Sequence, residues 1–265
     1  MSNTTTPKKR KAPVILGILL LIIAAIAGFF AWNAHVNLKA MHTAIDAGMA
    51  ELQERRTVTP VDAGDYSEIK MYGVMKFDVS QYDVQDIGNL SVMTTNMGFM
   101  QMVSFVVTPY EKDAPLLSMD YMYIFGNRKA YTEFYDLTPD VDAPDYQQAL
   151  AVIGELKTNY ADITELETES AWYDHLLTIA LHKQLKKDDA TMQAMFCDAL
   201  SLYLDACDAL PPMDDAQAAE KLAITQEYCD NLISKGGVST NVFKSALGEE
   251  QTKDFFDQVF FGTAR

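Results

Sequence analysis

A long run of apolar positions opens the pattern of the chain. From Ala12 to Ala34 there are 23 residues without a charge, most of them Leu, Ile, Ala, Gly and Phe. A helix of this length spans the roughly 30 Å hydrocarbon core of a bilayer. A cleavable signal peptide is the alternative, but its apolar region normally runs about 7–15 residues and ends at a small-x-small site. Because this run continues to Trp32, the sequence predicts one uncleaved transmembrane helix over residues 12–34.

Basic residues flank this run unequally. Residues 8–11 read Lys-Lys-Arg-Lys, whereas only Lys39 lies close on the other side. By the positive-inside rule, residues 1–11 form a basic cytoplasmic tail and residues 35–265 lie outside the cytoplasm. The expected location is the cell membrane, in single-pass topology.

The segment 35–60 has apolar residues at helical spacing, and this pattern ends before Pro60. The spaced positions are Val36, Met41, Ile45, Met49 and Leu52. Two interpretations remain open for this helix: a juxtamembrane stalk, or the first packed helix of the domain that follows over residues 61–265.

Beyond residue 68 the hydrophobic period shortens to two, which predicts strands. Five segments are rich in β-branched, aromatic and Met residues: 69–79, 90–95, 100–107, 116–125 and 129–137. They follow one another closely, with Gly126-Asn127 as a tight turn, and so predict an antiparallel meander. In segment 116–125 neither alternating set is polar, so both faces of the sheet should be covered.

After Pro144 the pattern is helical to the end of the chain. The predicted helices are 146–160, 170–185, 190–208, 214–233, 239–247 and 249–261. One helix before the strands and several after them predict an α+β fold: a central antiparallel sheet sandwiched between helices and preceded by one N-terminal transmembrane helix.

Composition and charge exclude several classes of protein. With 49% hydrophobic and 22% charged residues, the chain is neither disordered nor collagen-like. Beyond residue 34 the formal charge is 17 − 37 = −20, against −16 for the whole chain. A surface this acidic repels phosphate backbones, so nucleic acid is not an expected partner. Cys197, Cys207 and Cys229 form no C-x-x-C pair and are interpreted as small core residues.

The sequence lacks the common cofactor motifs, and no metal site is expected. The sequence holds no G-x-G-x-x-G, P-loop, G-x-S-x-G, H-E-x-x-H or EF-hand pattern. His175 and His182 lie seven apart on the predicted helix 170–185, but no third ligand has a fitting spacing. The aspartates between residues 136 and 145 lack the Gly turn and terminal Glu of a calcium loop, which favours a solvated turn.

Two blocks of the sequence resemble the ferredoxin-dependent bilin reductases. Residues 88–109 and 113–120 are similar to the central strands of that family. Gln226-Glu227-Tyr228-Cys229 and the segment 247–261 are similar to its closing helices. The similarity extends over about residues 68–139 and 220–262. It implies an α/β/α sandwich that binds a linear tetrapyrrole between the sheet and the C-terminal helices. It also implies no bound cofactor: electrons come singly from an external donor, ferredoxin or another protein, and side chains supply the protons.

The resemblance also implies roles for individual residues. Asp120 matches the strand aspartate that protonates the bilin. Ser104 stands where family members have a His or Asn facing the substrate, and Val92 stands where a substrate-contacting Glu can occur. Residues 235–237 replace a loop that often carries a second aspartate. Met102 is one of several methionines in or beside the strands that either fill a core or line a pocket for a planar ligand.

The predicted hairpin places a second carboxyl near Asp120. If the loop is Gly126-Asn127, Asp120 faces Glu133 across the strands, and like charges that close favour keeping one proton. A longer loop moves the partner to Phe134 or Tyr135. Burial between apolar faces also raises the pKa of a strand carboxyl. Asp120 and Glu133 are therefore the expected catalytic acids.

Arg128, at the same turn, is the only arginine between residues 57 and 264. Its planar fork suits a propionate of a bilin, so it is a candidate for substrate binding. The alternative is a solvated charge at a turn.

Taken with the resemblance, these patterns predict a membrane-anchored protein that binds and reduces a linear tetrapyrrole. Two alternatives remain open: an ectodomain that binds a tetrapyrrole without catalysis, and an adaptor of the same fold. Ferredoxin is acidic, and so is this domain, which is also expected outside the cytoplasm. A different electron donor is therefore favoured over an ordinary cytosolic ferredoxin.

Overall fold

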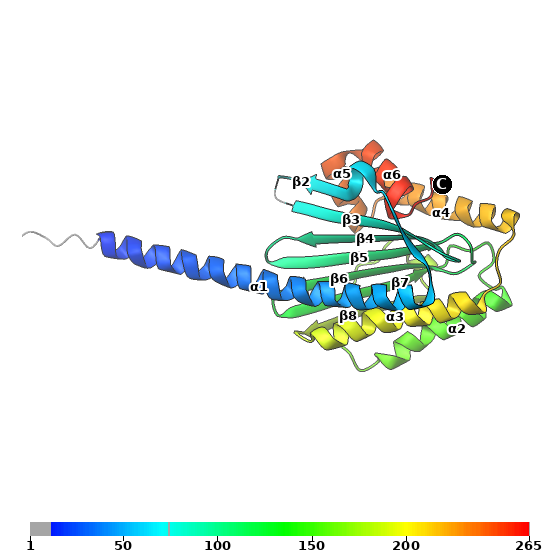
Figure 1. Ribbon diagram of the computed structural model, residues 1–265, viewed down its shortest axis with the longest axis horizontal. Coiled ribbons are helices and arrows are strands. Elements are labelled where there is room, and N and C mark those ends of the chain that lie inside the picture. Colours follow the sequence, from blue (N-terminus) through cyan, green and yellow to red (C-terminus); the bar gives the residue numbers. More distant parts are fainter. Residues whose placement is uncertain (1–11, 74, 265) are drawn as a thin grey trace, which may run out of the picture.

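A central sheet with helices on both faces forms the body of the molecule, and helix α1 projects from one end of it (Figure 1). The computed structural model describes residues 12–73 and 75–264. The predicted basic tail, residues 1–11, lies outside the described residues. The sheet has eight strands: β1 (Val58–Val61), β2 (Glu68–Met71), β3 (Met75–Val84), β4 (Gly88–Asn96), β5 (Met100–Pro109), β6 (Leu116–Ile124), β7 (Asn127–Tyr135) and β8 (Ile179–Lys186).

The strands pair antiparallel in the order β1-β3-β4-β5-β6-β7-β8, and β2 pairs with β3 beside β1. The helices are α1 (Ala12–Arg55), α2 (Pro144–Asn159), α3 (Asp189–Ala209), α4 (Asp215–Lys235), α5 (Val238–Leu247) and α6 (Glu249–Phe255), and a π-helical turn η3 (Phe256–Phe260) follows. The predicted α+β class with a central antiparallel sheet is confirmed.

Alternation along the strands builds two separate cores. On β6, Leu117, Met119 and Tyr121 face α1, α2 and α3, and the ring of Tyr121 lies 5.4 Å from that of Phe196 on α3. The other face meets α4, α5, α6 and η3, where Leu116 is buried. Both faces are apolar enough to be covered, as the sequence predicts.

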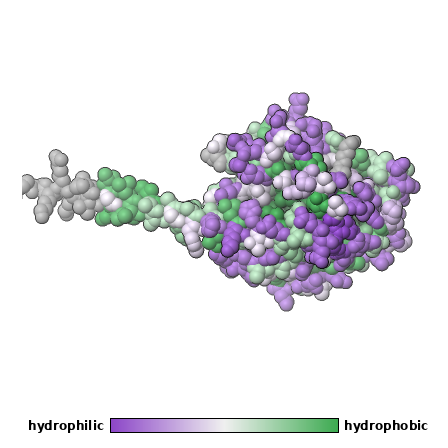
Figure 2. All heavy atoms as spheres, in the orientation of Figure 1, coloured by the Kyte–Doolittle hydropathy of each residue, from purple (hydrophilic) through white to green (hydrophobic). Residues whose placement is uncertain are grey.

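Helix α1 is one continuous element that changes environment halfway. From residue 15 to Trp32 its side chains are exposed, and this part is long and apolar enough to cross a membrane (Figure 2). Further along, Met41, Ala44 and Leu52 are buried against the sheet and α3. Of the two interpretations of residues 35–60, the structure shows a packed first helix that runs into the exposed segment without a break. The helix ends at Arg55, earlier than predicted, and β1 begins at Val58.

The segment 170–185 is not a helix, and this prediction is wrong. It forms a short 3-10 turn, Asp174–Leu176, followed by strand β8, which pairs with β7 along the edge of the sheet. Ile179, Leu181 and Lys183 alternate with partly exposed residues, so a period of two is also present in the sequence. Because Leu and Ala fit both periods, the cross-strand partners on β7 decide the structure.

The β6–β7 hairpin turns one residue earlier than predicted. Ile124 pairs with Asn127, so the loop is Phe125-Gly126, and Phe125 adopts a positive φ of 48°. This shift moves the partner of Asp120 from Glu133 to Tyr131. The longer-loop alternatives, with Phe134 or Tyr135 as partner, are also excluded.

Candidate functional site

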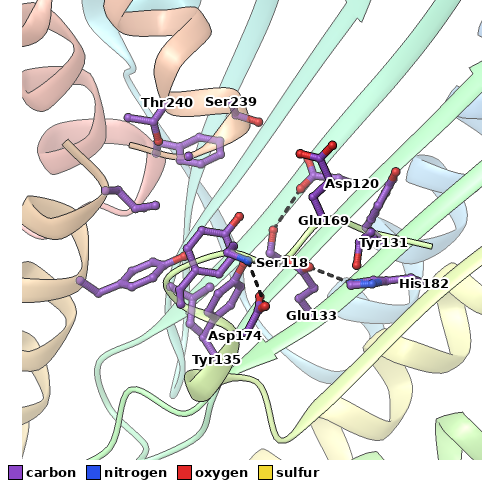
Figure 3. Close-up of a pocket in the computed structure, with 18 of the residues that line it drawn as sticks. Ser118, Asp120, Tyr131, Glu133, Tyr135, Glu169, Asp174, His182, Ser239 and Thr240 are labelled. Carbon is purple, nitrogen blue, oxygen red and sulfur yellow. Dashed lines mark hydrogen bonds and ion pairs between the residues drawn. The ribbon is translucent and has the colours of Figure 1, made fainter. Parts of the chain in front are cut away.

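A cavity of about 390 Å³ lies between the sheet and the C-terminal helices (Figure 3). Its volume falls in the range of small-molecule sites, about 300–1,000 Å³. The floor is formed by strands β5 to β8, and the roof by α4, the start of α5 and η3. The loop from Glu167 to Asp174 forms one side wall.

This side wall is fixed to the edge of the sheet by main-chain hydrogen bonds. The Leu166 N–H donates to the His182 carbonyl at 2.9 Å, and the Gln184 N–H donates to the Thr164 carbonyl at 3.0 Å. The loop thereby continues alongside β8 and brings Glu167 and Glu169 to the cavity.

Asp120 projects from β6 into the cavity and is half-buried. Its cross-strand neighbour on β5, Ser104, donates a hydrogen bond to Oδ1, and Ser118 Oγ lies 3.4 Å from Oδ2. Burial is the largest influence and raises the pKa of Asp120 from 3.8 to about 6; the charge of Glu133 acts in the same direction, and the two serines oppose it. This carboxyl is therefore half protonated near pH 6 and keeps its proton in about a tenth of the molecules at pH 7.

Glu133 lies on the same face of the sheet, on β7, and is held by two partners. Its Oε1 is 2.8 Å from His182 Nε2, and Tyr135 donates its hydroxyl proton to Oε2 at 2.6 Å. Direct pairing of Glu133 with Asp120 is wrong, because Ser118 stands opposite Glu133. The two carboxyls are diagonal neighbours, and their α-carbons are roughly 7–8 Å apart in such an arrangement.

Aromatic rings surround these carboxyls. The ring of Tyr131 lies 5.3 Å from that of His182, and the ring of Tyr228 on α4 lies 5.2 Å from that of Tyr135. Tyr173 stacks edge-on against Tyr135 at 5.8 Å. Flat apolar surfaces beside a proton-holding carboxyl suit a planar conjugated ligand that must be protonated.

The lining contains five carboxylic acids and one histidine, and neither Lys nor Arg. The acids are Asp120, Glu133, Glu167, Glu169 and Asp174. The interior of the cavity is therefore suited to donating protons or binding cationic nitrogen, and unsuited to holding an anionic group.

The predicted ligand of a carboxylate, Arg128, does not line the cavity. It pairs with Tyr123 on the opposite face of the sheet and is fully buried. Its Nε donates to Asp189 Oδ1 at 2.6 Å, and its Nη2 donates to Asn37 Oδ1 at 3.0 Å. The solvated-turn alternative is also wrong: Arg128 is a buried link between the sheet, α1 and α3.

Val92 is likewise on the far face. Its cross-strand partners are Ser80 and Phe105, and it is buried in the core with α1 to α3. Strand alternation explains this placement, because neighbours of odd number on β4, such as Met93, point to the cavity side. Met102 lines the cavity, whereas Ser104 reaches it through its hydrogen bond to Asp120.

Sequence reasoning missed several residues of the site. His182 lies on β8 and not on the predicted helix with His175. The period of two over residues 179–186 is a signal for this strand, whereas its place near Glu133 depends on the pairing of β8 with β7. The acidic loop 167–174 carries no sequence signal of its own, since its position depends on the pairing with β8. Among the described residues, no group of three or more His, Cys, Asp or Glu side chains is arranged to hold a metal ion.

The fold and the cavity define an α/β/α sandwich with a ligand-sized site between the sheet and the C-terminal helices. At the level of sequence, neither a family model nor a curated protein matches the chain. Among solved structures, it is similar to phytochromobilin synthase from tomato in complex with biliverdin, with a TM-score of 0.68. The two share 16% sequence identity, and the match covers 86% of this chain and 83% of that one. This likeness shows a bilin-reductase-like fold.

Proposed function

We propose that this protein is anchored in a membrane by α1, binds a linear tetrapyrrole in the cavity and reduces it. The observation that carries the proposal is the carboxyl of Asp120, whose pKa is raised to about 6 beside a wall of aromatic rings. The solved structure with a similar fold holds biliverdin, which supports this class of ligand.

The proposed reaction adds two electrons and two protons across one double bond of the tetrapyrrole. Both electrons are delivered singly by an external low-potential donor protein. Asp120 transfers its proton to the ligand first, because a protonated conjugated system accepts an electron more readily. Hydrogen bonds from Ser104 and Ser118 then stabilise the Asp120 carboxylate. The Glu133–His182 pair, on the same face, supplies the second proton.

The test is turnover of biliverdin by the full-length protein in detergent micelles, with a low-potential chemical one-electron reductant in place of the donor protein. In Asp120→Asn the side chain keeps its shape and cannot deliver the proton. We expect pigment binding to survive and reduction to fall about 100-fold or more, the typical contribution of a general acid. Asp78→Asn is the matched control, since this strand aspartate is exposed and forms its ion pair with Lys76 away from the cavity.

Three outcomes separate the candidate functions. A spectral shift on mixing that is followed by loss of conjugation supports the reductase. A single shift without turnover favours a tetrapyrrole-binding protein. No shift at all contradicts a tetrapyrrole ligand and leaves the adaptor. Unchanged turnover in Asp120→Asn removes Asp120 from the mechanism.

A further inference from the structure

The exposed part of α1 ends where the domain begins. Its 18 exposed residues from Ile15 to Trp32 rise roughly 27 Å at 1.5 Å per residue, close to the thickness of a bilayer core. The β6–β7 turn touches the last turns of this segment: the ring of Phe125 lies 6.3 Å from Phe29 and 5.5 Å from Phe30. With α1 across a bilayer, this turn lies at the membrane surface.

The register of the sheet brings the other hairpin turns to the same end. Met100 pairs with Ile124, so the β4–β5 turn lies beside the β6–β7 turn (Figure 1). The paired residues Met71 and Met75 place the adjoining ends of β2 and β3 next to them. Phe99 and Tyr72, at these turns, are 45% and 59% exposed. They are the two aromatic residues among the large hydrophobic side chains exposed in the described chain beyond α1.

A cation lies at the same level. The ammonium group of Lys187, directly after β8, is 5.5 Å from the centre of the Trp32 ring. Aromatic and basic side chains at one level are typical of protein that sits in the membrane–water interface. We name this end of the domain, formed by Trp32, Tyr72, Phe99, Phe125 and Lys187, the turn surface.

On the cavity side of the sheet, a strip of flexible apolar side chains connects the turn surface to the cavity. Met102 and Met122 form a cross-strand pair that lines the cavity, and Met100 and Ile124 form the next pair outward. All four are half-buried. Unbranched Met side chains move aside at low cost, which suits a passage for a large ligand.

The opposite end of the cavity is closed. On the same face, Leu116 and Tyr135 are buried. Here η3 is fastened to the sheet: Asn89 Nδ2 donates to the Val259 carbonyl at 3.2 Å, and Ser91 Oγ donates to the Phe260 carbonyl at 2.7 Å. Along the strands, the cavity is therefore more open at the half-buried methionine strip than at this end, and across the strands it is bordered by the exposed loop residues Glu167 and Glu169.

The distribution of basic side chains also favours entry of an acidic ligand from the methionine strip. The interior lining has neither Lys nor Arg. Lys129 stands opposite Met122 on the cavity face of β7, at the outer side of the strip, and is half-buried. A ligand with an apolar body and acidic ends would keep its carboxylates at this mouth, near the interface, and insert its ring system.

We propose that the turn surface rests on the bilayer and that the methionine strip is an entrance through which an amphiphilic tetrapyrrole passes from the lipid interface into the cavity. This inference rests on the proposed membrane anchor and ligand. It adds the route and the physical form of the substrate: a pigment dissolved in the membrane interface.

The first test measures contact of the turn surface with lipid in full-length protein reconstituted into vesicles with bromine-labelled lipid. Tryptophan is introduced as Phe99→Trp in a Trp32→Phe, Trp172→Phe background. The matched control is Val141→Trp in that background, because Val141 is exposed but precedes α2 at the other end of the strands. We expect strong quenching for Phe99→Trp and little for Val141→Trp. Equally weak quenching at both positions overturns the docking.

The second test measures the rate at which biliverdin moves from preloaded vesicles into the reconstituted protein. Met100→Glu puts a carboxylate at the entrance without touching the cavity lining, and Val242→Glu is the control on the exposed side of α5. We expect uptake by Met100→Glu to be about tenfold slower or more, since the ligand must pass a charge that resists desolvation. Equilibrium affinity should change far less.

The two tests separate this inference from the proposed function. If biliverdin binds and Met100→Glu takes it up as fast as Val242→Glu, the entrance is wrong while the ligand stands. If biliverdin does not bind at all but Phe99→Trp is quenched, the tetrapyrrole ligand and its entrance through the methionine strip are both wrong. The docking of the turn surface on the bilayer is then still supported. If vesicle lipid without pigment prevents biliverdin from binding in the cavity, a lipid occupies the cavity and the proposal is overturned.

Discussion

At the scale of single residues, opposing influences set the proton affinity of Asp120. Burial and the charge of Glu133 raise its pKa, and hydrogen bonds from Ser104 and Ser118 lower it. Ser104→Ala removes the stronger of the two hydrogen bonds to the carboxylate. We therefore expect the pKa of Asp120 to rise above about 6. The pH dependence of reduction should shift to higher pH, and the exposed Ser80→Ala is the control that should leave it unchanged.

Asp120 also links stability to pH. Its pKa is raised in the folded protein to about 6, whereas the unfolded chain has an ordinary Asp pKa of about 3.9. The contribution of this group to folding is therefore complete below pH ~4 and is lost as the pH rises through ~6. Asp120→Asn carries no such charge. Its free energy of unfolding should exceed that of the parent by up to roughly 2–3 kcal/mol at pH 7 and match it near pH 4.

That difference is measured by urea unfolding of the full-length protein in micelles at the two pH values. A constant difference between the variants at both pH values would show that Asp120 is ionised as readily in the folded protein as in the unfolded chain.

We expect Arg128 to stabilise the fold and to have no part in pigment binding. Arg128→Met leaves Asn37 Oδ1 buried without its donor and Asp189 without its cation. We expect a loss of about 3 kcal/mol or more in unfolding free energy, with pigment affinity unchanged in the folded fraction. Arg55→Met is the control, since Arg55 pairs with Asp205 and Asp208 near the surface, where ion pairs contribute about 0–1 kcal/mol. Weaker pigment binding by folded Arg128→Met would return Arg128 to the site.

The chemistry of these residues was easier to predict than their positions. Asp120 was identifiable because an Asp inside an apolar strand requires a partner or a function. Arg128 is suited by its chemistry to a carboxylate ligand, but strand alternation places it on the face opposite Asp120 in the observed register and in the predicted one alike. Side-chain partners far apart in sequence, such as Asn37 and Asp189, leave no local signal.

At the scale of elements, α1 is both the exposed helix and a wall of the first core. Gly48 lies where α1 crosses α3, and a Cβ there would come 2.4 Å from Phe196 Cε1. Gly28, on the exposed half of the same helix, has no heavy atom within 4 Å of such a Cβ. A substitution at Gly48 therefore tests the packing of α1 against the domain, whereas one at Gly28 changes the exposed part of the helix alone.

We expect Gly48→Ala to destabilise the domain by about 1–3 kcal/mol, because overpacking outweighs the gain of about 1 kcal/mol in helix propensity. Gly28→Ala should leave the unfolding free energy of the domain unchanged. Thermal or urea unfolding of both variants in micelles measures the contrast. Equal stability of the two would mean that the second half of α1 is a stalk after all.

Elements rich in β-branched and aromatic residues and bounded by turn residues were predicted well, and the segment that fits two periods was not. Strands β3 to β7 belong to the first group, although β4 and β5 are buried along most of their length. Segment 170–185 fits both the helical period and the period of two, and its pairing with β7 at the edge of the sheet makes residues 179–186 a strand. Strand β1 is absent from the prediction because its four residues are too few for a period to show. Strand β2 lies within the predicted strand segment 69–79, which the structure divides into β2 and β3.

At the scale of the whole molecule, the proposed membrane anchor predicts a definite orientation of the domain. The basic residues 8–11 favour a cytoplasmic N-terminus and a domain outside the cytoplasm. External protease should then digest residues 35–265 in intact cells, with the same fragments as after the membrane is opened. Protection in intact cells that is lost on opening the membrane would reverse the orientation.

The layered architecture could be predicted from the order of strands and helices, because both faces of the sheet are apolar and must be covered. The cavity could not. Its walls come from segments that no local pattern brings together: β6, β7, the loop before β8, and the last helices. The size of a cavity depends on side-chain packing between such segments, and the hydrophobic period of a sequence does not determine that packing.

Because η3 is hydrogen-bonded to β4, the order in which the chain is synthesised determines when the cavity is enclosed. Asn89 and Ser91 donate to carbonyl groups of residues 259 and 260, which are synthesised about 170 residues after them. Chains generally fold from the N-terminus as they emerge, so α1 and the sheet are complete before their roof is made. Until η3 has been made and has docked on β4, the acidic face around Asp120 stays open to water. A nascent or shortened molecule that lacks η3 would thus be a sheet with an open face, and the docking of η3 is the step that encloses the cavity.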